Sequence, residues 1–304
     1  MSRATVPPVL AATDARLLVD GVVAIDGLTL ETRGARVLLA GDVAPLLRVL
    51  LLGASPTASS GSAGVARGRF EVLGRDVARG AHLEALGVAL ADPPLPEGHT
   101  GESYLVWSGR LAGLRTAEAR TRSLAYLEGL VGVTSFAQRP LGRLGLLERR
   151  LLGLGAATLT SPEVIVVEEP LAGLDERGAV VMRTALELAG RERALVACVS
   201  RVGFDGAQAA LLAGATSLTV LRGGRLAFHG EPSRLLAGAR LFAVTVVAAS
   251  VAFEDALRAL GAELFGAGGS VNLAVLLPEG ETAKSIVAAA HRANAALLGC
   301  VPVL

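Results

Sequence analysis

Residues 161–175, with the sequence SPEVIVVEEPLAGLD, constrain the fold more than any other stretch of this chain. Val164–Val167 form a short, continuous apolar run of mostly β-branched residues, which is typical of a strand buried on both faces of a parallel sheet. Glu168 and Glu169 follow directly, and a turn that starts at Pro170 breaks the strand. Open α/β sheets bind ligands beyond the carboxyl ends of their strands, so the acidic pair is predicted to face a ligand site.

This pattern resembles the Walker B strand and D-loop of ATP-binding-cassette (ABC) transporter ATPase subunits, where four apolar residues precede Asp-Glu-Pro and a turn ending in Leu-Asp. The resemblance implies that Glu168 replaces the magnesium-side Asp. It also implies that Glu169 is the catalytic general base that orients water, and that Asp175 lies in the D-loop. Glu168 still offers the carboxylate oxygens that Mg²⁺ prefers. Taken alone, the motif fits equally well a buried strand that ends in a solvated acidic pair.

The segment expected to hold phosphate departs from that family. Val37–Ala40 is predicted to be a strand, and Gly41 begins the loop where G-x-x-x-x-G-K-[ST] should follow. Counted from Gly41, the last three motif positions are Leu46, Leu47 and Arg48; alternatively these residues already belong to the next helix, and Gly-Lys-Thr is deleted. Either way the phosphate cradle is absent. At about 1.5 to 3 kcal/mol per charged hydrogen bond, the loss removes roughly 5 kcal/mol and weakens ATP binding about a thousandfold.

Other positions that handle nucleotide in the family are also replaced. The Q-loop glutamine falls near Ala91, and the signature Leu-Ser-Gly-Gly-Gln reads Leu-Gly-Leu-Leu-Glu at residues 144–148. The switch Thr-His reads Ser200-Arg201, where Arg201 can contact phosphate but cannot act as a neutral imidazole. No aromatic residue for adenine stacking occurs near Val19–Gly21. The candidate nucleotide-binding residues are Gly41, Glu168, Asp175 and Arg201, with Glu168 as the candidate Mg²⁺ ligand and Glu169 as the candidate catalytic residue.

The resemblance predicts an α/β, P-loop NTPase-like ABC ATPase fold, with a mixed sheet and a helical subdomain, over residues 1–238. The helical subdomain spans roughly 93–160 and includes a predicted helix at 116–131. Residues 17–30 are predicted to form two strands around a turn at Asp26-Gly27, and residues 218–230 a hairpin that turns at Gly223-Gly224. Residues 58–64 are predicted to be a linker that precedes a strand at 70–73.

The last part of the chain, residues 239–304, is predicted to be a small separate domain. Its apolar segments alternate as strand, helix, strand, strand, helix, strand, which is the βαββαβ order of ferredoxin-like domains. It resembles the C-terminal extension of ABC-2 export ATPase subunits. This domain has no cluster of acids, histidines or cysteines in its sequence, so we expect a role in subunit interaction.

Composition limits the partners. The net charge of +1 gives no basic surface for nucleic acid. Mean hydropathy is high at +0.53, yet the most apolar runs, 46–54 and 242–253, are shorter than the roughly 18 residues of a spanning helix. The start of the chain lacks a secretory pattern, and two widely separated cysteines suit a reducing compartment. We expect a cytoplasmic protein on the inner face of the plasma membrane, bound to a membrane-spanning permease and paired with an active ABC ATPase subunit or with itself.

Three hypotheses follow from the sequence. The first is an ABC subunit that keeps the fold but binds ATP and magnesium weakly or not at all, and serves a structural or regulatory role in an export complex. The second is a working ATPase whose loop around residues 41–47 forms an unconventional phosphate site, in which Arg48, Arg201 or a residue of a partner supplies the positive charge. The third is a cytosolic scaffold that reuses the fold. An exposed apolar face at residues 104–114 would favour transport over a scaffold.

Overall fold

The structure is a computed structural model that describes residues 7–52, 61–130, 136–203, 206–236, 240–265 and 269–303. The chain divides into two compact units. Unit 1 takes in the described parts of Met1–His82, Ser200–Phe204 and Leu212–Leu304, and unit 2 those of Leu83–Val199 and Asp205–Leu211. Within the described ranges, no helix combines the length and apolar character needed to cross a bilayer.

The chain begins with an antiparallel sheet in unit 1, with strand order β2-β1-β4-β5. Its strands are β1 (Leu10–Val19), β2 (Val22–Glu31), β4 (Ala63–Val72) and β5 (Arg75–Asp76). The predicted turn at Asp26-Gly27 is wrong, because the first two strands turn at Asp20-Gly21, where both residues have positive φ as a type I′ hairpin requires. Asp26-Gly27 instead forms an irregularity inside β2, between the pairs Leu17↔Ile25 and Ala15↔Leu28. Gly27, with φ 69°, fits the left-handed position of a β-bulge.

The linker predicted at residues 58–64 is also partly wrong. Ala63 and Gly64 pair with Val19 and Leu18, so they belong to β4, which therefore starts well before the predicted strand at 70–73. Residues 58–60 lie outside the described part of the chain. Ala63 and Gly64 have low intrinsic β-propensity, so pairing with β1 decides their conformation.

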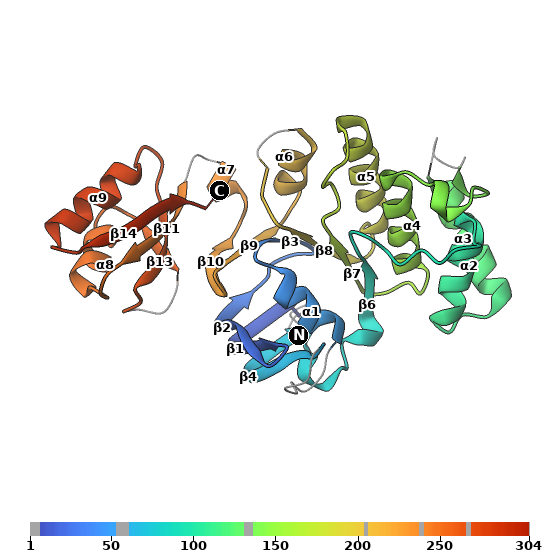
Figure 1. The fold of residues 1–304 in the computed structure, drawn as a ribbon, viewed down its shortest axis with the longest axis horizontal. Coiled ribbons are helices and arrows are strands. Elements are labelled where there is room, and N and C mark those ends of the chain that lie inside the picture. The colour runs from blue at the N-terminus through green and yellow to red at the C-terminus, as the bar shows by residue number, and fades with distance from the viewer. Residues whose placement is uncertain are drawn as a thin grey trace, which may run out of the picture. The chain divides into compact units, whose positions relative to one another are not determined.

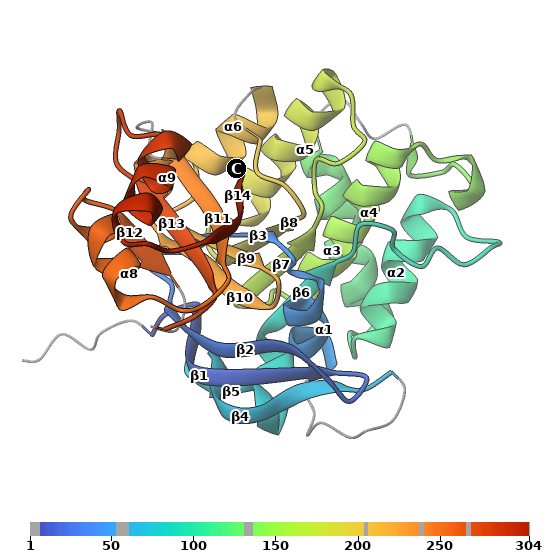
Figure 2. The ribbon, with the colours of Figure 1, turned by 60° about the vertical axis from the view of Figure 1, so that its left-hand side comes forward.

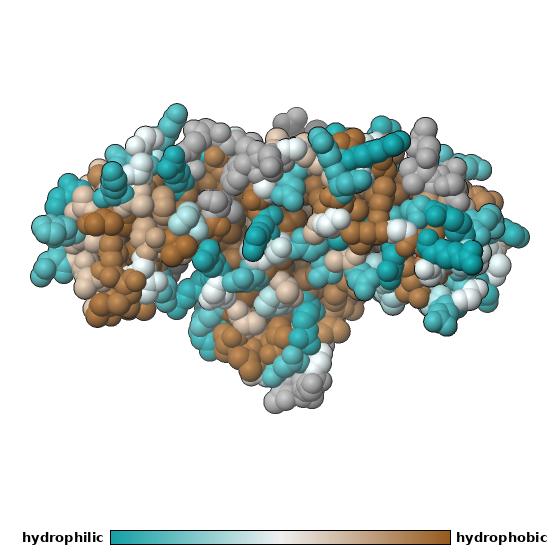
Figure 3. Space-filling view, turned by 45° about the horizontal axis from the view of Figure 1, so that its top comes forward, coloured by the Kyte–Doolittle hydropathy of each residue, from teal (hydrophilic) through white to brown (hydrophobic). Residues whose placement is uncertain are grey.

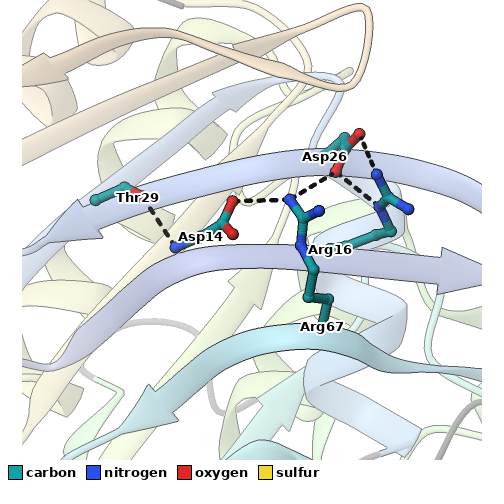
Figure 4. A network of polar contacts seen from close by, with 5 residues as sticks. All are labelled: Asp14, Arg16, Asp26, Thr29 and Arg67. Atoms are coloured by element: carbon teal, nitrogen blue, oxygen red, sulfur yellow. Dashed lines mark hydrogen bonds and ion pairs between the residues drawn. The ribbon is translucent and has the colours of Figure 1, made fainter. Parts of the chain in front are cut away.

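Two arginines cross-link the exposed face of this sheet (Figure 4). Arg16 forms a two-pronged pair with Asp26, with Nε–Oδ1 and Nη2–Oδ2 distances of 2.8 and 2.9 Å, and this holds the pKa of Asp26 below its usual value. Arg67 lies 2.9 Å from Asp14 and 3.7 Å from the same Asp26. The amide of Asp14 donates to Thr29 Oγ1 at 3.0 Å. The ion pairs join β1, β2 and β4 where β1 is irregular.

Helix α1 (Ala44–Leu52) packs its apolar face against this sheet (Figure 2). Its buried residues are Leu46, Leu47, Val49 and Leu50. The helix follows β3 (Arg36–Gly41), which pairs in parallel with β9 (Ser217–Arg222). Strand β9 continues into β10 (Arg225–Gly230) through the hairpin predicted at Gly223-Gly224, where both glycines have positive φ.

The C-terminal part of unit 1 has the predicted βαββαβ order. Its elements are β11 (Arg240–Val246), α8 (Val251–Arg258), β12 (Glu263–Phe265), β13 (Asn272–Leu277), α9 (Ala283–Arg292) and β14 (Leu297–Pro302). The sheet order β12-β13-β11-β14 is antiparallel throughout, and both helices cover one face of it (Figure 2). This is the ferredoxin-like topology that the sequence predicted.

Strand β10 joins this part to the rest of unit 1. The rings of Phe228 and Phe265 are 5.6 Å apart, and Arg234 of the short helix α7 (Ser233–Leu236) forms an ion pair with Glu263. The guanidinium of Arg234 also lies 5.9 Å from the centre of the Phe228 ring. The contact combines ring packing with a charge pair.

Unit 2 is built on three parallel strands (Figure 1), β6 (Leu86–Ala89), β7 (Val164–Glu168) and β8 (Ala194–Val199), with β7 in the middle. Residues 164–167 are buried, as expected for a strand covered on both faces. Helices α4 (Leu146–Thr158) and α5 (Glu176–Ala189) pack on the strands and on each other. Helix α5 starts directly after the turn at residues 170–175, and Leu146 at the start of α4 lies against Gly173 of the same turn.

The remaining helices of unit 2 are α2 (Gly101–Leu111) and α3 (Thr116–Gly129), which pack on each other and on α4. Thr100 caps α2 through a reciprocal pair of hydrogen bonds with Ser103. The predicted helix at 116–131 ends at Gly129, and Val131 lies outside the described residues. Helix α6 (Gly206–Ala213) begins in unit 2 and ends in unit 1.

Candidate functional site

The acidic pair lies at the carboxyl end of β7. Glu168 is opposite Cys198 of β8, and its Oε2 accepts a hydrogen bond from the amide of Ala91 at 3.1 Å. Glu169 donates its own amide to the Cys198 carbonyl at 2.7 Å and has a φ of 43°. Left-handed backbone is uncommon for a residue with a side chain and clusters at functional sites. The Glu168 carboxylate and the Glu169 backbone are therefore held at the edge of the sheet where α/β proteins bind ligands.

A buried arginine that the sequence analysis missed lies beside this pair. Arg150 of α4 is only 7% exposed, and its Nη1 donates to the carbonyl of Pro170 at 3.2 Å. Burial lowers the pKa of Arg150, while the charge of Glu169 raises it. Arg150 is thus an internal counter-cation for the acidic edge. A sequence signal existed, since Arg150 precedes two leucines on a helix whose following residues are almost all apolar.

Cys198 of β8 lies opposite Glu168. The thiol is buried, and burial together with the negative charges of Glu168 and Glu169 raises its pKa to about 12. A thiol with such a pKa is not a nucleophile at neutral pH. Cys198 is therefore part of the buried packing next to the acidic edge.

Asp175 caps the start of α5. Its Oδ1 accepts a hydrogen bond from the amide of Gly178 at 2.7 Å, which is the usual N-cap geometry. This bond accounts for an aspartate at that position without a nucleotide.

The N-terminus of α4, where the signature motif is expected, is occupied by a carboxylate from the same chain. Glu148 Oε2 accepts from the amide of Gly145 at 2.9 Å, and its Oε1 forms an ion pair with Arg139. Helix N-termini attract anions because their first amides are unpaired and the helix dipole is positive there. Here Glu148 supplies the anion, and Leu146 adds a 42% exposed side chain next to it.

In unit 1, the connection between β3 and α1 is too short for a phosphate cradle. Strand β3 ends at Gly41 and helix α1 begins at Ala44, so only residues 42 and 43 join them. Leu46–Arg48 lie inside α1, as the alignment with a shortened loop predicts. The connection, Asp-Val, contains neither the lysine nor the Ser/Thr of a P-loop.

The short connection is held by bonds to β9. Gly41 has a φ of 85°, and a Cβ at this position would lie 2.1 Å from the Leu221 carbonyl oxygen. Asp42 donates its amide to that same carbonyl at 2.9 Å, and its Oδ2 accepts from the amide of Gly223 at 2.7 Å. The close approach of the Gly41 and Leu221 backbones thus explains why residue 41 is a glycine. The carboxylate of Asp42 lies just before the start of α1.

The two cations that the second hypothesis invoked are placed differently. Arg48 pairs with Asp20, with Nη1–Oδ2 and Nη2–Oδ1 distances of 2.9 and 3.3 Å. This contact, with a further hydrogen bond from the amide of Gly61, lowers the pKa of Asp20. Arg201 is exposed two residues after β8. Among the residues that the structure describes, no group of three or more histidines, cysteines or acids is arranged to hold a metal.

These features define the class of the molecule as an ABC-type ATPase fold. A solved structure of CbiO1 from Clostridium perfringens, described as part of the ABC transporter complex CbiONQ, is similar with a TM-score of 0.62 at 17% identity, and covers 76% of this chain and 91% of its own. No protein-family model matches the sequence.

Curated relatives make the assignment more specific. The Nod factor export ATP-binding protein I of Azorhizobium caulinodans is 29% identical over 141 residues, which are 46% of this chain and 44% of the relative. The daunorubicin resistance ATP-binding protein DrrA3 of Streptomyces coeruleorubidus is 34% identical over 164 residues, or 51% and 48%. The chain is thus similar, over about half of its length, to ATP-binding proteins of export and drug-resistance systems, and this similarity supports an ABC-2 export-type ATP-binding subunit. The matches span about half the length of these relatives.

Proposed function

We propose that this chain is an ABC ATP-binding-subunit homologue that has lost most or all ATP binding and hydrolysis, and that it serves as a structural or regulatory subunit of a membrane export complex. The observation that carries the proposal is the two-residue connection between Gly41 and Ala44. ATP and magnesium are the ligands of the family, and the phosphates need a run of backbone amides and a lysine that this connection lacks.

The electrostatics support the same proposal. The loss of about 5 kcal/mol of phosphate contacts weakens ATP binding roughly a thousandfold. Asp42 and Glu148 then place carboxylates at the starts of α1 and α4, where the family positions phosphate oxygens. Like charges repel, and their repulsion adds to the cost of binding a nucleotide.

We further propose a membrane-spanning permease as partner, with the chain peripheral on the cytoplasmic face of the plasma membrane. Trp107 and Leu111 lie one helical turn apart on α2 and are 37% and 69% exposed. Leu124 of α3 is also exposed, at 39%. Exposed apolar residues on the two helices of the predicted subdomain (93–160) support a docking surface rather than a free scaffold.

A second subunit is part of the proposal, either an active ABC ATPase or a second copy of this chain. The predicted C-terminal domain (239–304) carries exposed apolar side chains, including Val251 at 68% and Leu298 at 70%. Apolar surface is visible on this part of the molecule (Figure 3). These side chains support the expected role of this domain in subunit interaction.

One observation favours the competing hypothesis of an unconventional ATPase. Glu169 retains the position of a general base, with left-handed backbone and the charge of Arg150 close by. A base accelerates hydrolysis only when a phosphate is held against it. Arg48 is paired with Asp20, so this alternative requires another cation.

The test is a titration of the purified chain with labelled ATP and Mg²⁺, together with a phosphate-release assay. Glu169→Gln removes the proposed base, and Glu187→Gln changes an exposed carboxylate on α5 as a matched control. We expect no saturable binding up to millimolar ATP and the same background phosphate release in all three proteins. Micromolar binding, with turnover lost in Glu169→Gln but kept in Glu187→Gln, would establish the unconventional ATPase instead.

A further inference from the structure

Unit 2 contains a cavity of ≈ 370 Å³ that the nucleotide-related motifs do not explain. Ser161, just before β7, and Arg193, just before β8, line it. The cavity therefore lies at the amino ends of these strands, whereas Glu168 and Glu169 lie at the carboxyl end. It is separated from the acidic edge by the length of β7, roughly 16 Å at about 3.3 Å per residue.

The walls are formed by the C-terminal ends of three helices. Helix α3 contributes Arg122, Ala125, Tyr126 and Gly129, whose spacing places them on one helix face. The apolar part of the wall is completed by Leu130, Leu159, Ala185, Leu188 and Ala189. A volume of this size with mostly apolar walls and a few polar groups is typical of a small-molecule site.

The polar part of the lining combines two guanidinium groups with the hydroxyl groups of Thr158 and Ser161. It contains Arg122 and Arg193 and, among the described residues, no acidic side chain. Arg122 Nη1 donates to the Leu159 carbonyl at 2.5 Å and to Ser161 Oγ at 3.3 Å, and Nη2 pairs with Glu118. Since a guanidinium carries five N–H groups, these bonds leave donors of Arg122 for a ligand.

The arginines are held in place by helix ends. Arg193 Nη1 donates to the Ala189 carbonyl at 3.2 Å, in the last turn of α5, as Arg122 does at the end of α4. Cations are favoured at helix C-termini, so the helices orient both guanidinium groups before any ligand binds. Tyr126 turns its hydroxyl away, to the Leu151 carbonyl at 2.5 Å, and presents its ring.

We propose that this cavity binds an amphipathic organic anion, with an apolar chain or ring against the leucines and a single carboxylate at Arg122 and Arg193. Guanidinium groups pair well with carboxylates, and the apolar walls exclude a small inorganic anion as the preferred ligand. The site does not depend on the state of the nucleotide motifs, so it stands or falls separately from the proposed loss of ATPase activity.

Gly129 offers a way to fill the cavity without removing any contact. It lies on the lining face of α3, and a Cβ built there meets nothing within 4 Å. Phenylalanine at this position also favours the helix more than glycine does. Gly142, in an exposed turn of unit 2, likewise has open space around its Cβ and provides the matched control, Gly142→Phe.

The experiment is calorimetric titration of the full chain with decanoate, and with decanol as the uncharged analogue. We expect saturable decanoate binding that Gly129→Phe weakens at least tenfold and Gly142→Phe leaves unchanged. Decanol should bind at least tenfold more weakly than decanoate, and this difference should disappear in the double variant Arg122→Gln/Arg193→Gln. Circular dichroism checks that each variant is folded.

Three results would overturn the proposal. The first is no saturable decanoate binding. The second is equal binding by Gly129→Phe and the unmodified chain, which would place the ligand elsewhere. The third is equal affinity for decanol and decanoate, which would show that the arginines do not select an anion.

Discussion

Replacing Glu148 tests whether its carboxylate stabilises the N-terminus of α4 as the geometry indicates. The Glu148→Ala variant loses the bond to the Gly145 amide, the favourable charge at the start of the helix and the ion pair with Arg139. These contributions are about 0.5 to 2 kcal/mol for the cap, 0.3 to 1 kcal/mol for the charge at the dipole, and 0.2 to 1 kcal/mol for a partly exposed ion pair. Together they predict a local loss of roughly 2 kcal/mol.

Hydrogen exchange measured by mass spectrometry detects this local loss of stability at the N-terminus of α4. Since 1.4 kcal/mol corresponds to a factor of ten, the hydrogen-bonded amides at the start of α4, those of Gly145 and Arg149, should exchange about 30-fold faster in Glu148→Ala. Glu148→Gln keeps the acceptor but loses the charge, so its effect should be about fivefold and should shrink in high salt. Peptides from the C-terminal domain should not change.

The control is Glu187→Ala, which removes an exposed pair with Arg183 on α5. Such a pair contributes about 0.3 to 0.5 kcal/mol, so exchange in α4 should stay the same. Unchanged exchange of the Gly145 and Arg149 amides in Glu148→Ala would refute the reasoning. It would mean that the helix start is held without the carboxylate, and the electrostatic argument against nucleotide binding there would lose its support.

Three further outcomes are expected. Urea denaturation of Gly41→Ala should show a free energy of unfolding lower by about 3 kcal/mol or more, because backbone strain adds to a clash of the new Cβ with the Leu221 carbonyl oxygen. Gly61 has the same φ of 85° but open space around its Cβ, so Gly61→Ala should lower the free energy of unfolding by only about 1 kcal/mol. Burial lowers the pKa of His82 in the folded chain. As the pH drops below about 6.5, the unfolded chain therefore takes up a proton first, and the free energy of unfolding should fall, less so in His82→Gln. Equal pH profiles of stability for the two proteins would contradict this prediction. Cys198 should resist thiol reagents at pH 8 until the chain unfolds, because it is buried and its pKa is about 12. The half-buried Cys300 should react in the folded protein. Equal labelling rates of the two cysteines in the folded protein would be inconsistent with the burial of Cys198.

The fold was predictable where the local sequence pattern favours the same conformation as the packing of the folded chain. The continuous β-branched run at 164–167 suits only a fully buried strand, and Gly223-Gly224 leaves little choice but a tight hairpin turn. The opening hairpin was mispredicted because the chain offers two Asp-Gly pairs that start six residues apart. Both supply positive φ, and only the pairing of β1 with β2 decides that one makes the turn and the other the bulge.

The candidate site was predictable in its parts but not in its contacts. The positions of Glu168 and Glu169 follow from the strand that precedes them. The counter-cation Arg150 lies about twenty residues away in sequence, and its burial depends on how α4 packs. Likewise, the sequence left two alignments of Leu46–Arg48 open, because a leucine-rich helix and a degenerate loop use the same residues.

The two residues between β3 and α1 also limit what evolution or engineering can do with this chain. Most of the motif positions that differ from the family can be changed to the family residue by exchanging one amino acid for another, as with a glutamine for Ala91. A phosphate-binding loop cannot be made in this way here, because only two residues join β3 to α1 and Gly41 is already in contact with β9. A longer loop requires an insertion that also releases Asp42 from Gly223. With this short turn, point mutations can refine the binding subunit that we propose but cannot create a P-loop enzyme.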